Sequence, residues 1–265
     1  MHELARHSGR FLSFLMHSGT RYQVHSPFIY DLIGQVIRNR SADPATQPIE
    51  ALRMRHLSSR EVIQKTDFGA GSGFPGKRTY PVDVRHIAKT SLASRRNALR
   101  LHHLARYINA TRILELGTSL GITTAYLAIA APDARIISLE GCPELCRMAR
   151  SGFDALGIRN VEIVEGRFED RLGDALESLG KVDLLFIDGD HRKGAMLENF
   201  ERCRSYLHND SAVLLDDIHH SAGMEEAWNT LAQRADVTVS LDLFRTGWLF
   251  FRNESTKEHF RLRYL

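Results

Sequence analysis

Two acidic clusters are the residues of this sequence best suited to chemistry. They are "FIDGDH" (186–191) and "LLDDIHH" (214–220), and each combines two aspartates with histidine. Carboxylates held close together repel one another, so a cation is expected among them. Such a group can bind a divalent metal through hard oxygen ligands or take a proton from a hydroxyl group, and the histidines are alternative bases. The side chains are Asp188, Asp190, His191, Asp216, Asp217, His219 and His220.

Helix capping is a simpler explanation of the same aspartates. The first cluster can cap a helix that begins near Arg192, and the second can cap one that begins near Ser221. A cap uses one carboxylate in each cluster and leaves the other unexplained. Both interpretations stay open at the level of sequence.

Both clusters follow short, apolar, β-branched runs that read as strands. Five such runs are separated by helix-length segments, which is typical of βαβ units and a parallel sheet. The last two are joined by two residues, too few for a crossover, and must pair antiparallel. The sequence therefore predicts a Rossmann-like, doubly wound α/β fold with a seven-stranded sheet. The predicted strands are 112–116, 135–140, 161–165, 182–188, 211–217, 237–244 and 247–251.

The chain before residue 108 has helical rather than strand periodicity. Ser26-Pro27 is a helix start signal, and the apolar residues after it recur at helical spacing. Residues 48–65 and 94–108 continue this pattern, as does 82–93. We therefore divide the chain into a helical N-terminal extension, 1–107, that shapes the substrate site, and a core domain, 108–265.

The glycine-rich segment "DFGAGSGFPGKR" (67–78) looks like a nucleotide loop but lacks the context of one. A phosphate-binding loop needs a strand that enters it and a helix that leaves it. The residues before Asp67 have a helical pattern, two prolines follow, and Arg78 stands where a P-loop has a hydroxyl. We interpret the segment as a lid over an acceptor pocket or as a solvated linker.

A second glycine turn, within residues 113–130, meets these requirements. A predicted strand enters it, Gly117 and Gly121 bracket it, and an apolar helix leaves it. Glycine lets the backbone approach a ligand without a Cβ in the way. The next strand ends in Glu140, an acid placed to bind ribose hydroxyls. A dinucleotide dehydrogenase would need glycine at position 119, where this sequence has Ser119.

The motif Glu115-Leu-Gly117-x-x-x-Gly121 resembles the first motif of class I S-adenosylmethionine (SAM)-dependent methyltransferases, in the variant of catechol-type O-methyltransferases. The resemblance covers about residues 108–252. It implies that the glycines pass under the methionine part of SAM, that Glu140 holds the ribose and that Phe168 stacks on adenine. The cofactor-binding residues implied in this way are Glu115, Gly117, Thr118, Ser119, Gly121, Thr123, Glu140, Gly141, Gly166, Arg167, Phe168 and Asp188.

The acidic clusters resemble those of metal-dependent O-methyltransferases that act on sugar or aromatic hydroxyls. Carried across, Asp188, Asp216 and Asp217 would bind Mg²⁺, and Asp190 would be the general base, with His191 as a second catalytic candidate. Catechol-type enzymes have Asp-Asn at the second cluster, so the register of the aspartate pair stays open.

Composition limits the partners. Residues 1–110 carry 17 Lys and Arg against 7 Asp and Glu, and the remainder carries 18 against 25. The basic residues are scattered, which favours docking within the chain over nucleic-acid binding. The three cysteines form no C-x-x-C pair, and no apolar run is long enough to span a membrane, so a cytoplasmic protein is predicted.

The predicted function is SAM-dependent O-methylation of a small molecule, with a homodimer as the predicted assembly. The strand before Gly189 does not end in the N/D-P-P-Y/F pattern, which argues against nucleic-acid or glutamine N-methylation. Two alternatives stay open: a nucleic-acid or protein methyltransferase that uses the basic half, and a module that binds SAM without turnover.

Overall fold

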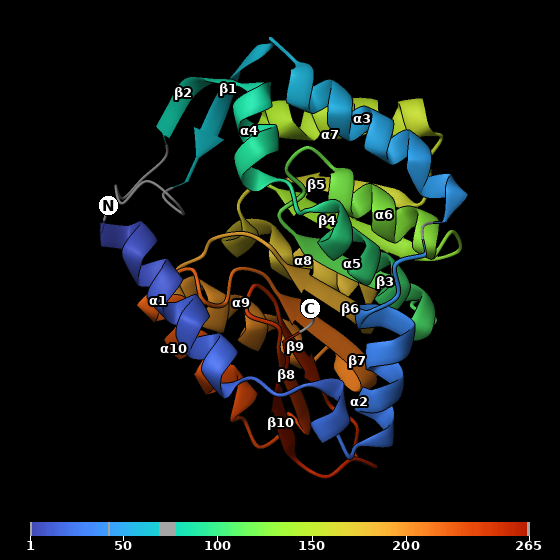
Figure 1. Cartoon of the computed structure of the whole chain (residues 1–265). Helices are drawn as coiled ribbons and strands as arrows, with labels where there is room; N and C mark the ends of the chain where they lie inside the picture. The colour runs from blue at the N-terminus through green and yellow to red at the C-terminus, as the bar shows by residue number, and fades with distance from the viewer. Residues whose placement is uncertain (1, 42, 69–77, 264–265) are drawn as a thin grey trace. The chain divides into compact units, whose positions relative to one another are not determined.

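The computed structural model describes residues 2–41, 43–68 and 78–263. Its contacts divide the chain into two compact units, Asn39–Gly180 and Met1–Arg38 with Lys181–Leu265. The main sheet is mostly parallel and counts eight strands among the described residues, one more than predicted, and helices alternate with strands along the chain (Figure 1). The α/β fold class is confirmed. The predicted boundary at 107/108 is a division by function and stays a prediction.

The unit of residues 39–180 is built on three parallel strands, with β4 (Arg135–Glu140) between β3 (Arg112–Leu116) and β5 (Val161–Glu165). These bounds are the predicted ones. Buried side chains dominate β3 and β4, as expected for parallel strands covered on both faces. The helices are α3 (Gln47–Ser58), α4 (Val84–Ser91), α5 (Arg95–Tyr107), α6 (Ile122–Ala130), α7 (Pro143–Leu156) and α8 (Phe168–Leu179), with a 3₁₀ turn at Pro44–Thr46.

The same unit contains an antiparallel hairpin that the sequence did not predict. The helix expected over 48–65 ends at Ser58, and β1 (Val62–Asp67) pairs with β2 (Arg78–Asp83). The helical prediction was wrong for these residues because their strand partner lies more than ten residues away. A strand does enter the first glycine-rich segment, and β2 follows it where a nucleotide loop has a helix. Residues 69–77 lie outside the described residues. The hypothesis of a lid falls on these residues and stays a prediction.

The second unit contains the rest of the main sheet. Its strands lie in the order β10-β8-β9-β7-β6, and β6 and β7 are parallel whereas β9 runs antiparallel to both neighbours. The predicted antiparallel pairing of the last two predicted strands is therefore confirmed. The strands are β6 (Val182–Ile187), β7 (Leu207–Leu215), β8 (Val239–Asp242), β9 (Gly247–Phe250) and β10 (Glu258–Arg261).

Strand β10 was missed because its segment, "EHFR", is polar. It pairs with β8 alone in the described sheet, and an edge strand needs fewer apolar residues than a central one. In the same unit α1 lies beside α10 (Figure 1), with an ion pair between Arg10 and Glu225. The helices are α1 (His2–His17), α2 (Pro27–Leu32), α9 (Lys193–Arg204) and α10 (Ala222–Ala232), with a 3₁₀ turn at Arg21–Gln23 and a π-helical turn at Ile33–Ile37. Within the described ranges, no helix has the length and apolar character of a membrane span.

Candidate active site

The turn between β3 and α6 has a backbone that only certain residues can adopt. Gly117, Ser119 and Gly121 have φ angles of 108°, 49° and 76°. A Cβ on Gly121 would lie 2.9 Å from the ring of Phe153, so the position has neither the conformation nor the room for a side chain. The turn leads directly into the first turn of α6, where Thr123 is buried and free backbone N–H groups favour an anion.

The side chain of Glu115 connects β3 to the elements around this turn by hydrogen bonds. Its side chain is fully buried, and one carboxylate oxygen accepts hydrogen bonds of 2.5 Å from the hydroxyls of Thr124 and Ser138. The hydroxyl of Thr118 lies 2.5 Å from that of Ser138. Burial raises the pKa of Glu115 to about 7, and the two hydroxyl donors oppose the rise. The network ties β3, β4, α6 and the turn together.

Glu140, at the end of β4, is bound by backbone amides. Its Oε2 accepts from Ser119 N at 2.9 Å, and its Oε1 accepts from Cys142 N at 2.9 Å. Burial raises the pKa of Glu140, whereas these two amides and the charge of Lys65 lower it. A carboxylate has about four lone-pair positions, so Glu140 can accept further hydrogen bonds while it holds the turn in place.

The loop after β5 lies next to Glu140. Gly166 N donates to Glu140 O at 2.9 Å, and Gly166 has a φ of 138°. Arg167 is the N-cap residue of α8 and Phe168 is the first residue of that helix, where it is half-buried. The structure thus brings together the predicted cofactor residues of this unit, from Glu115 to Phe168.

The first acidic cluster lies before the N-cap position of α9. The N-cap residue of α9 is Arg192, without a side-chain cap, so neither Asp188 nor Asp190 occupies the N-cap position. Asp190 instead accepts two hydrogen bonds from the Arg192 guanidinium, at 2.6 and 2.5 Å. His191 Nε2 lies 3.9 Å from Asp188 Oδ1. Asp190 has a φ of 53°, which turns the chain sharply after the strand.

The second acidic cluster likewise lies before the N-cap position of α10. Ser221 caps α10, and its hydroxyl accepts from Met224 N at 3.1 Å. Asp216 is almost fully buried and Asp217 is half-buried.

The guanidinium of Arg245 contacts both of these carboxylates. Its Nη2 lies 3.2 Å from Asp216 Oδ2, and its Nε lies 3.4 Å from Asp217 Oδ1. Burial raises the pKa of Asp216, and Arg245 opposes that rise. Burial disfavours the charged guanidinium, yet the two aspartates raise the pKa of Arg245 above its usual range.

The three histidines have different surroundings. His219 is buried: Nε2 lies 3.0 Å from Asp242 Oδ2, and the ring stacks on Phe244 at 5.2 Å between centroids. It is therefore packed inside the unit. The rings of His191 and His220 lie 6.1 Å apart, and His191 Nδ1 is buried with no hydrogen-bond partner among the described residues.

Residues 114–218 match the model of a family described as a methyltransferase domain. This segment, about two fifths of the chain, is similar to that family. The chain is 38% identical over 121 residues to a catechol O-methyltransferase from Niastella koreensis (44% of this chain, 54% of the relative). It is 38% identical over 94 residues to one from Mycobacterium tuberculosis (33% and 40%). The chain therefore spans about half the length of these relatives.

Solved structures share the fold of this chain. The O-methyltransferase TomG from Streptomyces achromogenes, in complex with SAM, superposes with a TM-score of 0.57 at 20% identity, over 85% of this chain and 95% of that one. The SAH-bound methyltransferase PaMTH1 from Podospora anserina gives 0.59 at 17% identity, over 87% and 98%. The class I methyltransferase fold predicted from the glycine motif is confirmed.

The two acidic clusters do not fit an added metal ion as their side chains stand. The Arg245 guanidinium already contacts Asp216 and Asp217 and supplies positive charge there. Across the described ranges, no three His, Cys, Asp or Glu side chains are arranged to hold a metal. Mg²⁺ bound by Asp188, Asp216 and Asp217 stays a prediction.

Two contacts of the predicted site residues were not foreseen. Phe68, directly after β1, lies against Gly141, and Arg245 neutralises the second acidic cluster. Neither has a local signal, because each partner is far away in the sequence. The position of Arg245 in the four-residue turn between β8 and β9 (243–246) was the available hint, since β9 pairs with both β8 and β7.

Proposed function

We propose that this chain is a SAM-dependent O-methyltransferase that acts on a small molecule. The observation that carries the proposal is a pair of buried polar atoms at the glycine turn that lack hydrogen bonds. Glu115 Oε1 and Ser119 Oγ are buried and have no hydrogen-bond partner among the described residues. Buried polar atoms without partners are rare in folded proteins, and a ligand rich in N–H and O–H groups would supply them.

The residues of the unit 39–180 fit SAM in kind. The N–H groups at the start of α6, with Thr123, suit the carboxylate of its methionine part. The remaining lone pairs of Glu140 suit the two ribose hydroxyls. Gly166, Arg167 and Phe168 follow the neighbouring strand and would line the adenine.

When bound, SAM supplies a methyl group on a sulfonium, and the chain need only align an acceptor oxygen and remove its proton. His191 and Asp190 are the candidate bases. His191 has an unpartnered ring nitrogen and lies near Asp188, which would stabilise the protonated ring. Both oxygens of Asp190 accept from Arg192, which leaves this carboxylate less free to take a proton. We therefore favour His191.

The cofactor part is tested by calorimetric titration of S-adenosylhomocysteine (SAH) into the purified protein, in EDTA and then with Mg²⁺. Micromolar binding is expected, and Glu140→Ala should abolish it. Glu162→Ala, an exposed glutamate on β5, is the matched control and should bind like the wild type. Absence of binding in both buffers would overturn the proposal.

The chemical part is tested by a screen of catechols, phenols and sugar hydroxyls with SAM. His191→Gln should lower kcat by about 10²-fold or more with an unchanged SAH affinity, and Asp190→Asn should lower it less. Equal losses would reassign the base. Tight SAH binding without turnover on any acceptor class would favour a SAM-binding module instead.

A further inference from the structure

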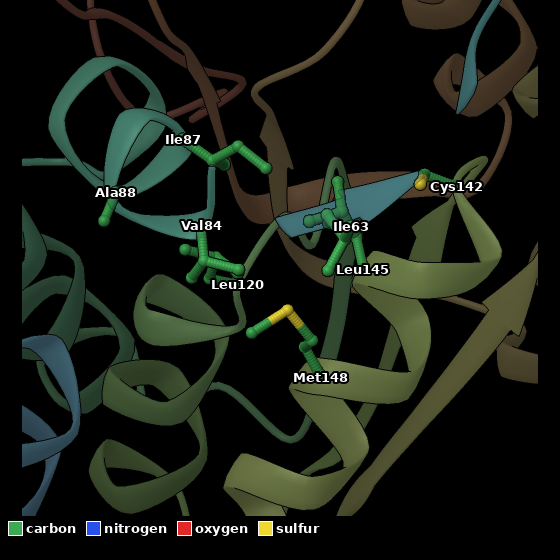
Figure 2. Packing of buried hydrophobic residues seen from close by; sticks show 8 residues of the cluster. All are labelled: Ile63, Val84, Ile87, Ala88, Leu120, Cys142, Leu145 and Met148. Carbon is green, nitrogen blue, oxygen red and sulfur yellow. The ribbon is translucent and has the colours of Figure 1, made fainter. Parts of the chain in front are cut away.

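The hairpin β1–β2 and helix α4 share a buried core with the glycine turn. Figure 2 shows the cluster, in which Leu120 of the turn lies near Val84 of α4 while Ile63 of β1 lies near Leu145 of α7. Leu120 is fully buried. The segment before the methyltransferase motif is therefore packed onto the backbone that holds the predicted cofactor site. The cluster is Ile63, Val84, Ile87, Ala88, Leu120, Cys142, Leu145 and Met148.

Polar contacts connect the same hairpin to Glu140. Thr66 N donates to Cys142 Sγ at 3.3 Å, and Cys142 N donates to Glu140 Oε1 at 2.9 Å. Lys65 is close enough for its charge to lower the pKa of Glu140. One residue, Cys142, thus contacts both β1 and the acid that is predicted to hold the ribose.

Phe68 directly follows β1, and its half-buried ring lies near one residue of each loop predicted to hold adenosine, Gly141 and Arg167. A Cβ on Gly141, after β4, would lie 2.7 Å from Phe68 Cε2 and 2.9 Å from Cδ2. The guanidinium carbon of Arg167, after β5, lies 5.7 Å from the centre of the ring. The ring therefore takes the space that a side chain at position 141 would fill.

We propose that Phe68 forms one wall of the adenosine site, in place of a side chain at position 141. The inference rests on the proposed function, because it assumes that SAM binds at the glycine turn. An aromatic face beside the loops after β4 and β5 suits a purine, which stacks on aromatic rings. The hairpin is then part of the cofactor site, and Gly141 is glycine because it must admit the ring.

The test compares Phe68→Ala, Gly141→Leu and the double variant by titration with SAH and with 5′-methylthioadenosine, which share adenosine. Phe68→Ala should weaken both ligands by about tenfold, the loss expected for one aromatic–base contact. Gly141→Leu alone should also weaken them, because its side chain meets Phe68. The double variant should recover most of the affinity, since leucine then fills the space left by the ring.

Tyr80→Ala removes an aromatic ring from β2 of the same hairpin and is the matched control, with affinity expected within twofold of wild type. If the wild type does not bind SAH, the proposed function fails. If the wild type binds and Phe68→Ala binds equally well, this inference alone is overturned. A weakened Phe68→Ala without recovery in the double variant would also overturn it, because the ring would then act through the fold of the hairpin.

Discussion

At the scale of single residues, the predicted site is a set of buried charges with identifiable partners. One oxygen of Glu115 accepts from two hydroxyls, Glu140 accepts from backbone amides, and Asp216 contacts Arg245. Burial alone would make each carboxylate costly, and the partner decides how much of that cost remains. These partners make the charges testable by pH and by substitution.

Glu115 should make stability depend on pH. Its pKa of about 7 in the folded chain lies above the ordinary 4.5, so the folded state binds the proton more tightly than the unfolded state. The free energy of unfolding should therefore fall as pH rises from about 4.5 to 7, by on the order of 3 kcal/mol. Glu115→Gln should lack this part of the slope in urea unfolding at pH 5 and pH 8. Glu162→Gln is the exposed control, and an unchanged slope in Glu115→Gln would contradict the prediction.

Arg245 should make added magnesium unnecessary for stability. The melting temperature of the wild type should be the same in EDTA and in millimolar Mg²⁺. Arg245→Gln leaves two carboxylates without their cation. It should lower the free energy of unfolding by about 1–3 kcal/mol, a figure reduced because the Arg245 side chain is partly exposed. Mg²⁺ should restore part of this loss, because hard oxygen ligands are then free. Stabilisation of the wild type by Mg²⁺ would show that an ion displaces or joins Arg245.

At the scale of elements, α1 packs on the loops that follow β7 and β8. Phe14 is buried, and its ring lies 5.3 Å from Phe244 and 6.2 Å from His219. Arg10 adds an ion pair with Glu225. A helix this close to the second acidic cluster agrees with the expectation that the N-terminal segment shapes a substrate site, which stays a prediction.

Removing the Phe14 ring should weaken the packing of α1 on these loops. If the helix stays docked, Phe14→Ala should lower the free energy of unfolding by about 3 kcal/mol, since it empties a buried aromatic position. Otherwise the helix undocks and its amides exchange faster with solvent. Hydrogen exchange of residues 9–17, together with thermal unfolding, distinguishes these results. Leu12→Ala, which changes a side chain that is 60% exposed, is the control and should leave both measurements near those of the wild type.

At the scale of the whole molecule, several arginines of the basic N-terminal half form ion pairs with acidic residues of the same chain. In the basic first 110 residues, Arg53 pairs with Glu50, Arg106 pairs with Asp43, and Arg10 pairs with Glu225. Paired arginines release fewer counterions on meeting a phosphate backbone, which lowers the affinity for nucleic acid. This favours the small-molecule proposal over the nucleic-acid alternative.

The nucleic-acid alternative is tested by measuring the binding of a structured RNA at 50 and 200 mM salt. We expect no saturable binding at micromolar protein in either condition. Micromolar affinity that falls by about 10³-fold or more between the two salt concentrations would instead indicate several phosphate contacts and revive the alternative. A size-exclusion run in the same buffers reports whether the predicted homodimer forms.

The sequence by itself determined the elements whose signals are local. Apolar β-branched runs place β3, β4 and β5 to the residue, and the glycine turn with Glu140 was recognisable because its conformation and its neighbouring strands are encoded within about thirty residues. The tertiary structure decided what depends on distant partners. Residues 62–65 form a strand because β2 pairs with them, Arg245 contacts the two aspartates that follow β7, and Phe68 reaches Gly141 from a separate hairpin. Local pattern cannot specify such contacts, since their energy is gained only after the chain has closed the intervening loops.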